Sequence, residues 1–150
     1  MEMFLTNISI GLIVATIWGC GFHIYTQIME HKRLYKNCKG DMAYNKSILA
    51  KIEAAFSRSE DIINIADSVY ATNGIREFLY LRPLKMEEIY YSSLKSLLIS
   101  LESSNKIMES ALFRNDAGKH VMIGNLLKGQ TNNIEVLYKA LEGSELVRES

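Results

Sequence analysis

The feature that most constrains this chain is a run of 27 residues, from position 3 to position 29, that contains no Asp, Glu, Lys or Arg. Roughly 20 apolar residues in a helix cross the ~30 Å hydrocarbon layer of a membrane, because each residue adds about 1.5 Å. The run is long enough to do so, although Asn7, Thr16 and three glycines make it only moderately apolar. We therefore predict a transmembrane anchor over residues 1–30.

The residues that flank this run distinguish an anchor from a cleaved signal peptide. A signal peptide begins with basic residues and ends at a small-residue cleavage site, whereas Glu2 precedes this run and no Ala-x-Ala follows it. A basic juxtamembrane segment is predicted instead over residues 31–43, with the positive charges on Lys32, Arg33, Lys36 and Lys39. These four side chains are expected to contact lipid headgroups, and the positive-inside rule places the amino terminus outside and the carboxyl terminus in the cytoplasm.

Every fourth residue of the uncharged run is small or polar. The predicted helix-packing face consists of Asn7, Gly11, Ala15, Gly19 and His23, and Gln27 continues the line. Small residues spaced four apart let two membrane helices approach closely, so this face is expected to bind a second copy or another membrane protein. The alternative is a chance alignment, because Gly and Ala are common in membrane helices.

The rest of the chain predicts an all-α fold: a small antiparallel helical bundle, or a short coiled-coil hairpin, over residues 44–143. Residues 144–150 are predicted to be a flexible tail. Apolar residues recur at alternating steps of three and four in three segments, which is typical of helices that bury one face. The predicted bundle seam comprises Ile52, Ile62, Leu94, Leu97, Leu101, Ile123, Leu127, Ile134 and Leu137.

Turn-forming residues divide these segments. The first helix is expected to run from near residue 44 to near residue 70 and to stop at Asn73-Gly74. Residues 75–81 fit either a short helix or a loop. The second long helix is predicted to start near Pro83, and a turn over residues 115–118 leads to the third. Gly129 lowers the helix propensity of the third segment, so a kink or break is expected there.

The sequence argues against an enzyme and against a nucleic-acid binder. Lys and Arg number 17 and Asp and Glu also number 17, so the net charge is zero and no basic surface is expected. The three histidines lie in different segments, and neither Cys20 nor Cys38 completes a metal-ligand motif. We predict no catalytic residue, cofactor, metal or small-molecule substrate. Cys38 is expected to be a reduced thiol, with palmitoylation as the alternative.

In layout alone, an uncharged run followed by basic residues and a helical bundle resembles two sorts of bacterial protein. These are the small exclusion and immunity proteins of mobile elements and phages, and the anchors of cell-division and envelope scaffolds. The missing long linker favours the former. We predict a non-enzymatic, single-pass protein of the bacterial inner membrane that binds lipid and a protein partner as a homo-oligomer. The alternatives are a holin or pore-forming toxin, a scaffold anchor, or a soluble protein whose first helix is buried.

Overall fold

The computed structural model describes residues 2–58, 68–81, 87–112, 117–142 and 144, and it describes side chains from residue 14 onward, apart from residues 112–120. These residues form four α-helices and no strand, which confirms the all-α prediction. The helices are α1 (Glu2–Ser57), α2 (Asn73–Tyr80), α3 (Glu88–Leu112) and α4 (Ala117–Leu141). Contacts divide the chain into two units, residues 1–33 and residues 34–150.

Helix α1 differs from the sequence prediction at both of its expected boundaries. It passes without a break through residues 31–43, which contain no proline and are rich in Lys and other good helix formers. It ends at Ser57, and residues 68–72 are not helical, so the prediction of a helix reaching residue 70 is wrong. Among the residues that the structure describes, no helix holds a stretch both long and apolar enough to cross a membrane.

The short α2 corrects a second prediction. Asn73-Gly74 begins this helix and does not stop one, and residues 75–80 are helical. Thr72, the residue before the helix, makes no side-chain capping bond. The Asp41 carboxylate of α1 accepts bonds from the backbone N–H of Gly74 at 2.6 Å and of Ile75 at 3.3 Å, and so caps α2 from a different helix.

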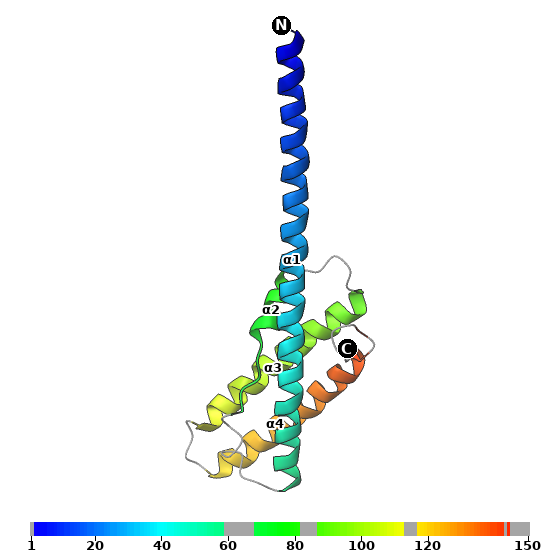
Figure 1. The fold of residues 1–150 in the computed structure, drawn as a ribbon. Helices are drawn as coiled ribbons and strands as arrows, with labels where there is room; N and C mark the ends of the chain where they lie inside the picture. Colours follow the sequence, from blue (N-terminus) through cyan, green and yellow to red (C-terminus); the bar gives the residue numbers. More distant parts are fainter. Residues whose placement is uncertain (1, 59–67, 82–86, 113–116, 143, 145–150) are drawn as a thin grey trace. The chain divides into compact units, whose positions relative to one another are not determined.

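Helices α3 and α4 pack side by side and run antiparallel (Figure 1). Helix α4 is continuous through Gly129, so the expected break is absent there, because one glycine costs about 1 kcal/mol and packing on both sides of it outweighs that cost. Helix α3 begins at Glu88, a few residues after Pro83, which lies outside the described residues.

The core of the second unit follows the heptad-like spacing of its helices. Leu34, Cys38 and Met42 of α1 are buried at four-residue steps, so the core begins ahead of residue 44, where the bundle was predicted to start. Among the predicted seam residues, Leu137 is partly buried and Ile62 lies outside the described residues. The other seven are buried: Ile52, Leu94, Leu97, Leu101, Ile123, Leu127 and Ile134.

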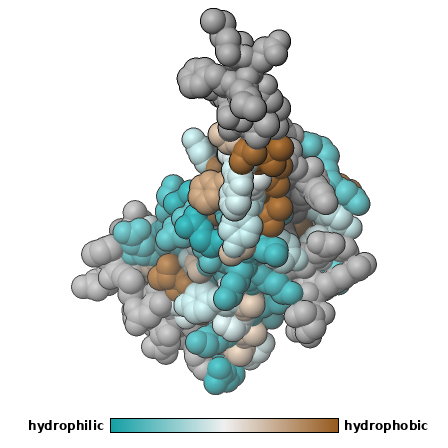
Figure 2. All heavy atoms as spheres, turned by 45° about the horizontal axis from the view of Figure 1, so that its top comes forward, coloured by the Kyte–Doolittle hydropathy of each residue, from teal (hydrophilic) through white to brown (hydrophobic). Residues whose placement is uncertain are grey.

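On the face drawn in Figure 2, the brown hydrophobic side chains form separate patches among teal hydrophilic ones. The polar side chains therefore lie mostly outward, as expected when a helix buries only one face.

Candidate interaction surfaces

The first unit exposes an unusual amount of apolar surface. Every residue from 14 to 33 is exposed, and Trp18, Phe22 and Ile17 expose 76%, 69% and 65% of their surface. At 100° per residue, the eight large apolar side chains fall within an arc of about 160° on the helix. They are Val14, Ile17, Trp18, Phe22, Ile24, Tyr25, Ile28 and Met29, and we call them the aromatic arc.

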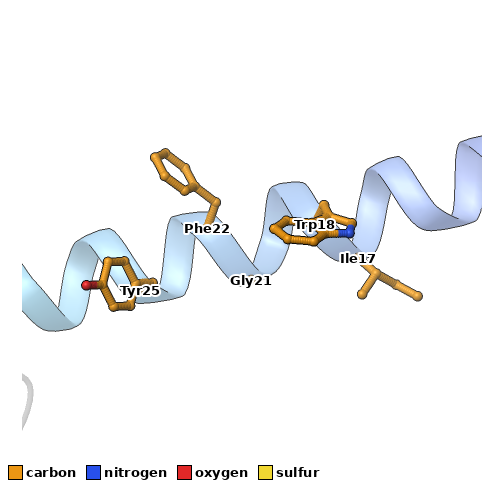
Figure 3. A pocket seen from close by; sticks show the side chains of 5 residues that line it. All are labelled: Ile17, Trp18, Gly21, Phe22 and Tyr25. Carbon is orange, nitrogen blue, oxygen red and sulfur yellow. The ribbon is translucent and has the colours of Figure 1, made fainter.

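A shallow apolar notch lies within the aromatic arc. Figure 3 shows Ile17, Trp18, Phe22 and Tyr25 around Gly21, and these five residues line the notch. A Cβ atom added at Gly21 would meet no other atom within 4 Å. The notch is therefore an open depression on one helix, with room for a side chain or an acyl chain of a neighbouring molecule.

The opposite side of the same helix carries small and polar residues. Ala15, Gly19 and His23 of the predicted packing face lie here, whereas the side chains of Asn7 and Gly11 lie outside the described residues. A line of every fourth residue turns by about 40° per step on a helix, so these three share an arc of about 80°. We call this side the polar arc, and on it His23 Nε2 and Gln27 Nε2 are 3.0 Å apart in a hydrogen bond.

The four predicted lipid-contacting residues fall in both units. Lys32 and Arg33 are exposed in the first unit, where an Arg33 guanidinium nitrogen lies 3.9 Å from a Glu30 carboxylate oxygen. In the second unit Lys36 is exposed and Lys39 is half-buried. Leu34 and Cys38 are buried in the core, so the two lysines occupy the outward side of this part of α1.

Two buried or half-buried asparagines, absent from the sequence prediction, hold the segment that precedes α2. The Asn45 side chain of α1 donates to the Ala71 carbonyl and accepts from the Ala71 N–H, both at 2.7 Å. Asn105 of α3 accepts from the Tyr70 N–H at 2.8 Å and donates to the Tyr70 carbonyl at 2.9 Å. Each side-chain amide bonds to both the N–H and the carbonyl of one residue, as the backbone of a neighbouring strand would. We call Asn45 and Asn105 the asparagine clamp.

Three buried side chains near the clamp carry a titratable group: the thiol of Cys38 and the hydroxyls of Tyr70 and Tyr138. Burial raises the pKa of the Cys38 thiol to about 12, and the Asp41 carboxylate adds to the shift. Burial also raises the pKa values of the Tyr70 and Tyr138 hydroxyls, and Tyr138 donates to the Met42 carbonyl at 3.1 Å. A protonated, buried thiol is a poor nucleophile. Among the described residues, no three His, Cys, Asp or Glu side chains gather as metal ligands.

Comparison of the sequence with known protein families, with curated proteins and with solved structures gives no match.

Proposed function

We propose that this chain is a non-enzymatic, membrane-anchored interaction protein whose second unit presents a helical bundle to a protein partner. The observation that carries the proposal is the aromatic arc, in which eight large apolar side chains are exposed on one side of a helix. Exposed apolar surface of this extent marks contact with lipid or protein. The arc belongs to the 27-residue uncharged run, and Trp18 and Tyr25 are aromatics favoured at membrane interfaces.

The charges on either side of the uncharged run support one orientation of the chain in the membrane. Glu2 precedes the run, while Lys32, Arg33, Lys36 and Lys39 follow it. Positive charge is retained on the cytoplasmic side, so the proposed topology is single-pass, amino terminus outside, in a bacterial inner membrane. The layout without a long linker favours an exclusion or immunity role over a division scaffold.

The polar arc supports a helix-packing role within that membrane. Ala15 and Gly19 allow close approach of a second helix, and His23 and Gln27 offer donors and acceptors that lipid cannot satisfy. The aromatic arc would then face lipid. A second copy of the chain, or a helix of a membrane complex, is the proposed partner.

Fractionation of cells that express the full chain tests whether its first unit anchors it in the membrane. A carboxyl-terminally tagged chain should stay with membranes through carbonate washing, and its tag should be protected from protease added outside the cell. Substitution of Trp18, Phe22 and Tyr25 by Ser should release it, whereas Thr16→Ser on the polar arc should not. Recovery of the wild-type chain in the soluble fraction would favour a soluble protein with a covered first helix.

A pore-forming role is a second candidate, and the polar arc is the observation that favours it. Several copies could turn His23 and Gln27 towards a water-filled lumen and the aromatic arc towards lipid. Dye leakage from vesicles containing the full chain would support a pore, and vesicles that stay sealed would support the anchor.

A further inference from the structure

Asn73 and Gly74 form the only Asn-Gly pair in the sequence. Such a pair is prone to spontaneous loss of the asparagine amide, because glycine has no side chain to hinder its own backbone nitrogen. In that reaction the Gly74 nitrogen loses its proton and bonds to Asn73 Cγ. The bond from Cγ to Nδ2 breaks, ammonia leaves, and a five-membered cyclic imide remains. Asn73 is exposed, so water can reach the amide and the imide.

Water then opens the imide at one of its two carbonyls. Cleavage between Cγ and the nitrogen gives aspartate on an ordinary backbone. Cleavage between the backbone carbonyl carbon and the nitrogen gives isoaspartate, in which the chain runs through Cβ and Cγ and is longer by one atom. Neither step needs an oxidant, a reductant or a cofactor. The pair and water are therefore sufficient for the reaction, and the fold decides when it can occur.

The folded conformation keeps the reacting atoms apart. Asn73 is the first residue of α2, and the helical ψ of about −42° leaves its Cβ and the Gly74 nitrogen about 80° apart around the Cα–C bond. The imide ring requires these two atoms to be nearly eclipsed. The Gly74 N–H also donates to Asp41 Oδ2 at 2.6 Å. A carboxylate at this distance disfavours the nitrogen anion that would attack Cγ.

The backbone is held on both sides of Asn73, so its ψ angle cannot turn alone. The asparagine clamp bonds both backbone groups of the two residues that precede Thr72. After Asn73, Asp41 bonds the next two backbone N–H groups, and the Arg76 N–H donates to the Thr72 carbonyl at 2.9 Å. A turn of about 80° at Asn73 would break the bonds to Asp41 or those of the clamp. The reaction therefore requires α2 to open.

We propose that Asn73 is a site of spontaneous modification that reacts only when the bonds from Asp41 to α2 open, and that isoaspartate at this position keeps α2 from closing again. The extra backbone atom would lie between the Thr72 carbonyl and the Arg76 N–H, which bond in the first turn of α2. The modification would mark chains whose second unit has opened. This inference requires neither a membrane nor the proposed function.

The surroundings of Gly74 explain why the longer backbone would not fit. A Cβ atom on Gly74 would stand 2.7 Å from the backbone carbonyl of Asn37, so Gly74 cannot move towards α1 to absorb an added atom. Isoaspartate also carries a free carboxylate at the start of α2, where the Asp41 carboxylate already lies 3.0 Å from the same Cβ position. Two like charges would then repel each other across the contact.

Peptide mapping by mass spectrometry tests the control by Asp41, with the full chain aged at neutral pH in the fraction where it is recovered. Asp41→Ala should speed deamidation of Asn73 by at least about tenfold, because loss of a hydrogen bond to a charged group shifts the opening equilibrium by roughly that factor. Leu97→Ala is the control for general loss of stability, compared at the urea concentration that gives both variants the same free energy of unfolding. It should speed the reaction less.

Three results would overturn this control. The first is an equal rate in Asp41→Ala and in the wild-type chain. The second is a slower rate in Asp41→Ala, which would mean that the carboxylate acts as a base that assists the attack. The third is an equal rate in Asp41→Ala and Leu97→Ala at matched stability, which would mean that Asn73 reacts only after global unfolding.

Hydrogen exchange of the aged chain tests the consequence for α2. Peptides with asparagine, aspartate or isoaspartate at position 73 separate by chromatography, so one sample reports the protection of each population. Chains with isoaspartate should lose protection over residues 75–80. The Asn73→Asp variant, which carries the charge on an ordinary backbone, is the control and should keep it. Isoaspartate chains as well protected as Asn73→Asp would contradict the release of α2.

Discussion

At the scale of single residues, the second unit depends on a few close contacts between segments distant in sequence. Gly74 lies where a Cβ atom would stand 2.7 Å from the carbonyl carbon and oxygen of Asn37. Only the absence of a side chain lets α2 approach α1 so closely. Asp41, one turn further along α1, accepts both bonds that cap α2, so the two contacts together position α2.

Gly74→Ala should destabilise the second unit by about 1–3 kcal/mol, the usual cost of overpacking a site bounded by backbone. Gly40→Ala is a matched control, because a Cβ atom there meets nothing within 4 Å. It should instead stabilise α1 by about 0.5–1 kcal/mol through helix propensity. Hydrogen exchange of the α2 and α3 amides in the full chain measures both effects, and equal protection in the two variants would contradict the close contact.

Burial of Cys38 predicts a loss of stability at alkaline pH. Its pKa is raised from 9.0 to about 12 in the folded chain, so the folded state holds the proton that the unfolded state releases above pH 9. The stabilisation is complete below pH 9 and falls as the pH rises towards 12, by about 1.4 kcal/mol at pH 10. Cys38→Ala should remove this part of the pH dependence in urea unfolding, and Cys20→Ala should not.

At the scale of elements, the packing of α2 and of the segment before it differs from that of α3 against α4. The long helices meet through apolar seams, whereas residues 70–75 are held by the asparagine clamp and by Asp41. Side-chain amides here satisfy backbone groups that no strand or helix satisfies. Loss of Asn45 leaves the N–H and carbonyl of Ala71 without this partner, and loss of Asn105 does the same to those of Tyr70.

Asn45→Ala and Asn105→Ala should each cost about 1–3 kcal/mol for the unpaired backbone groups. The double variant should cost less than the sum, because the two amides hold adjacent residues and either loss frees the segment. Urea unfolding of the full chain measures the four stabilities. Asn125→Ala, at an exposed position on α4, should change stability little. Strict additivity would mean that the two amides act on separate segments.

Between α3 and α4, burial predicts a graded response to truncation. Leu97 is fully buried and Leu137 only partly so. Leu97→Ala should therefore cost about 2–5 kcal/mol and Leu137→Ala less. Thermal melting of the full chain compares them with Ser96→Ala at an exposed position. If Leu137→Ala proved the more costly, the assignment of Leu97 to the central layer would be wrong.

At the scale of the whole molecule, the two units present different chemistry to their surroundings. The first exposes an apolar arc and a polar arc on one helix, while the second buries a continuous core. Under the proposed function, topology depends on the basic residues that follow the uncharged run, two in the first unit and two at the start of the second. That dependence can be separated from insertion itself.

Replacement of Lys32, Arg33, Lys36 and Lys39 together by Gln should leave the chain in the membrane and give mixed orientations, because charge asymmetry sets the direction of insertion. A reporter fused after residue 150 would then be detected on both sides of the membrane. Replacement of Lys46, Lys51, Lys95 and Lys106 in the second unit by Gln is the control and should keep a cytoplasmic reporter. Unchanged orientation in the first variant would mean that folding of the bundle holds the topology.

The periodicity of the sequence by itself determined the all-α fold and much of the core. Helical spacing is a local property, and an apolar stripe along a helix must be buried. Leu94 and Leu101 on α3, and Leu127 and Ile134 on α4, follow from this rule alone, and all four are buried.

Only the tertiary structure decided where α1 ends, that Gly74 begins a helix, and that Asp41 and the asparagine clamp hold residues 70–75. These contacts join residues 26 to 35 positions apart, and no local pattern marks an asparagine that will meet a distant backbone. Helical periodicity is a property of neighbours along the chain, whereas capping, clamping and exposure depend on which segments meet in space.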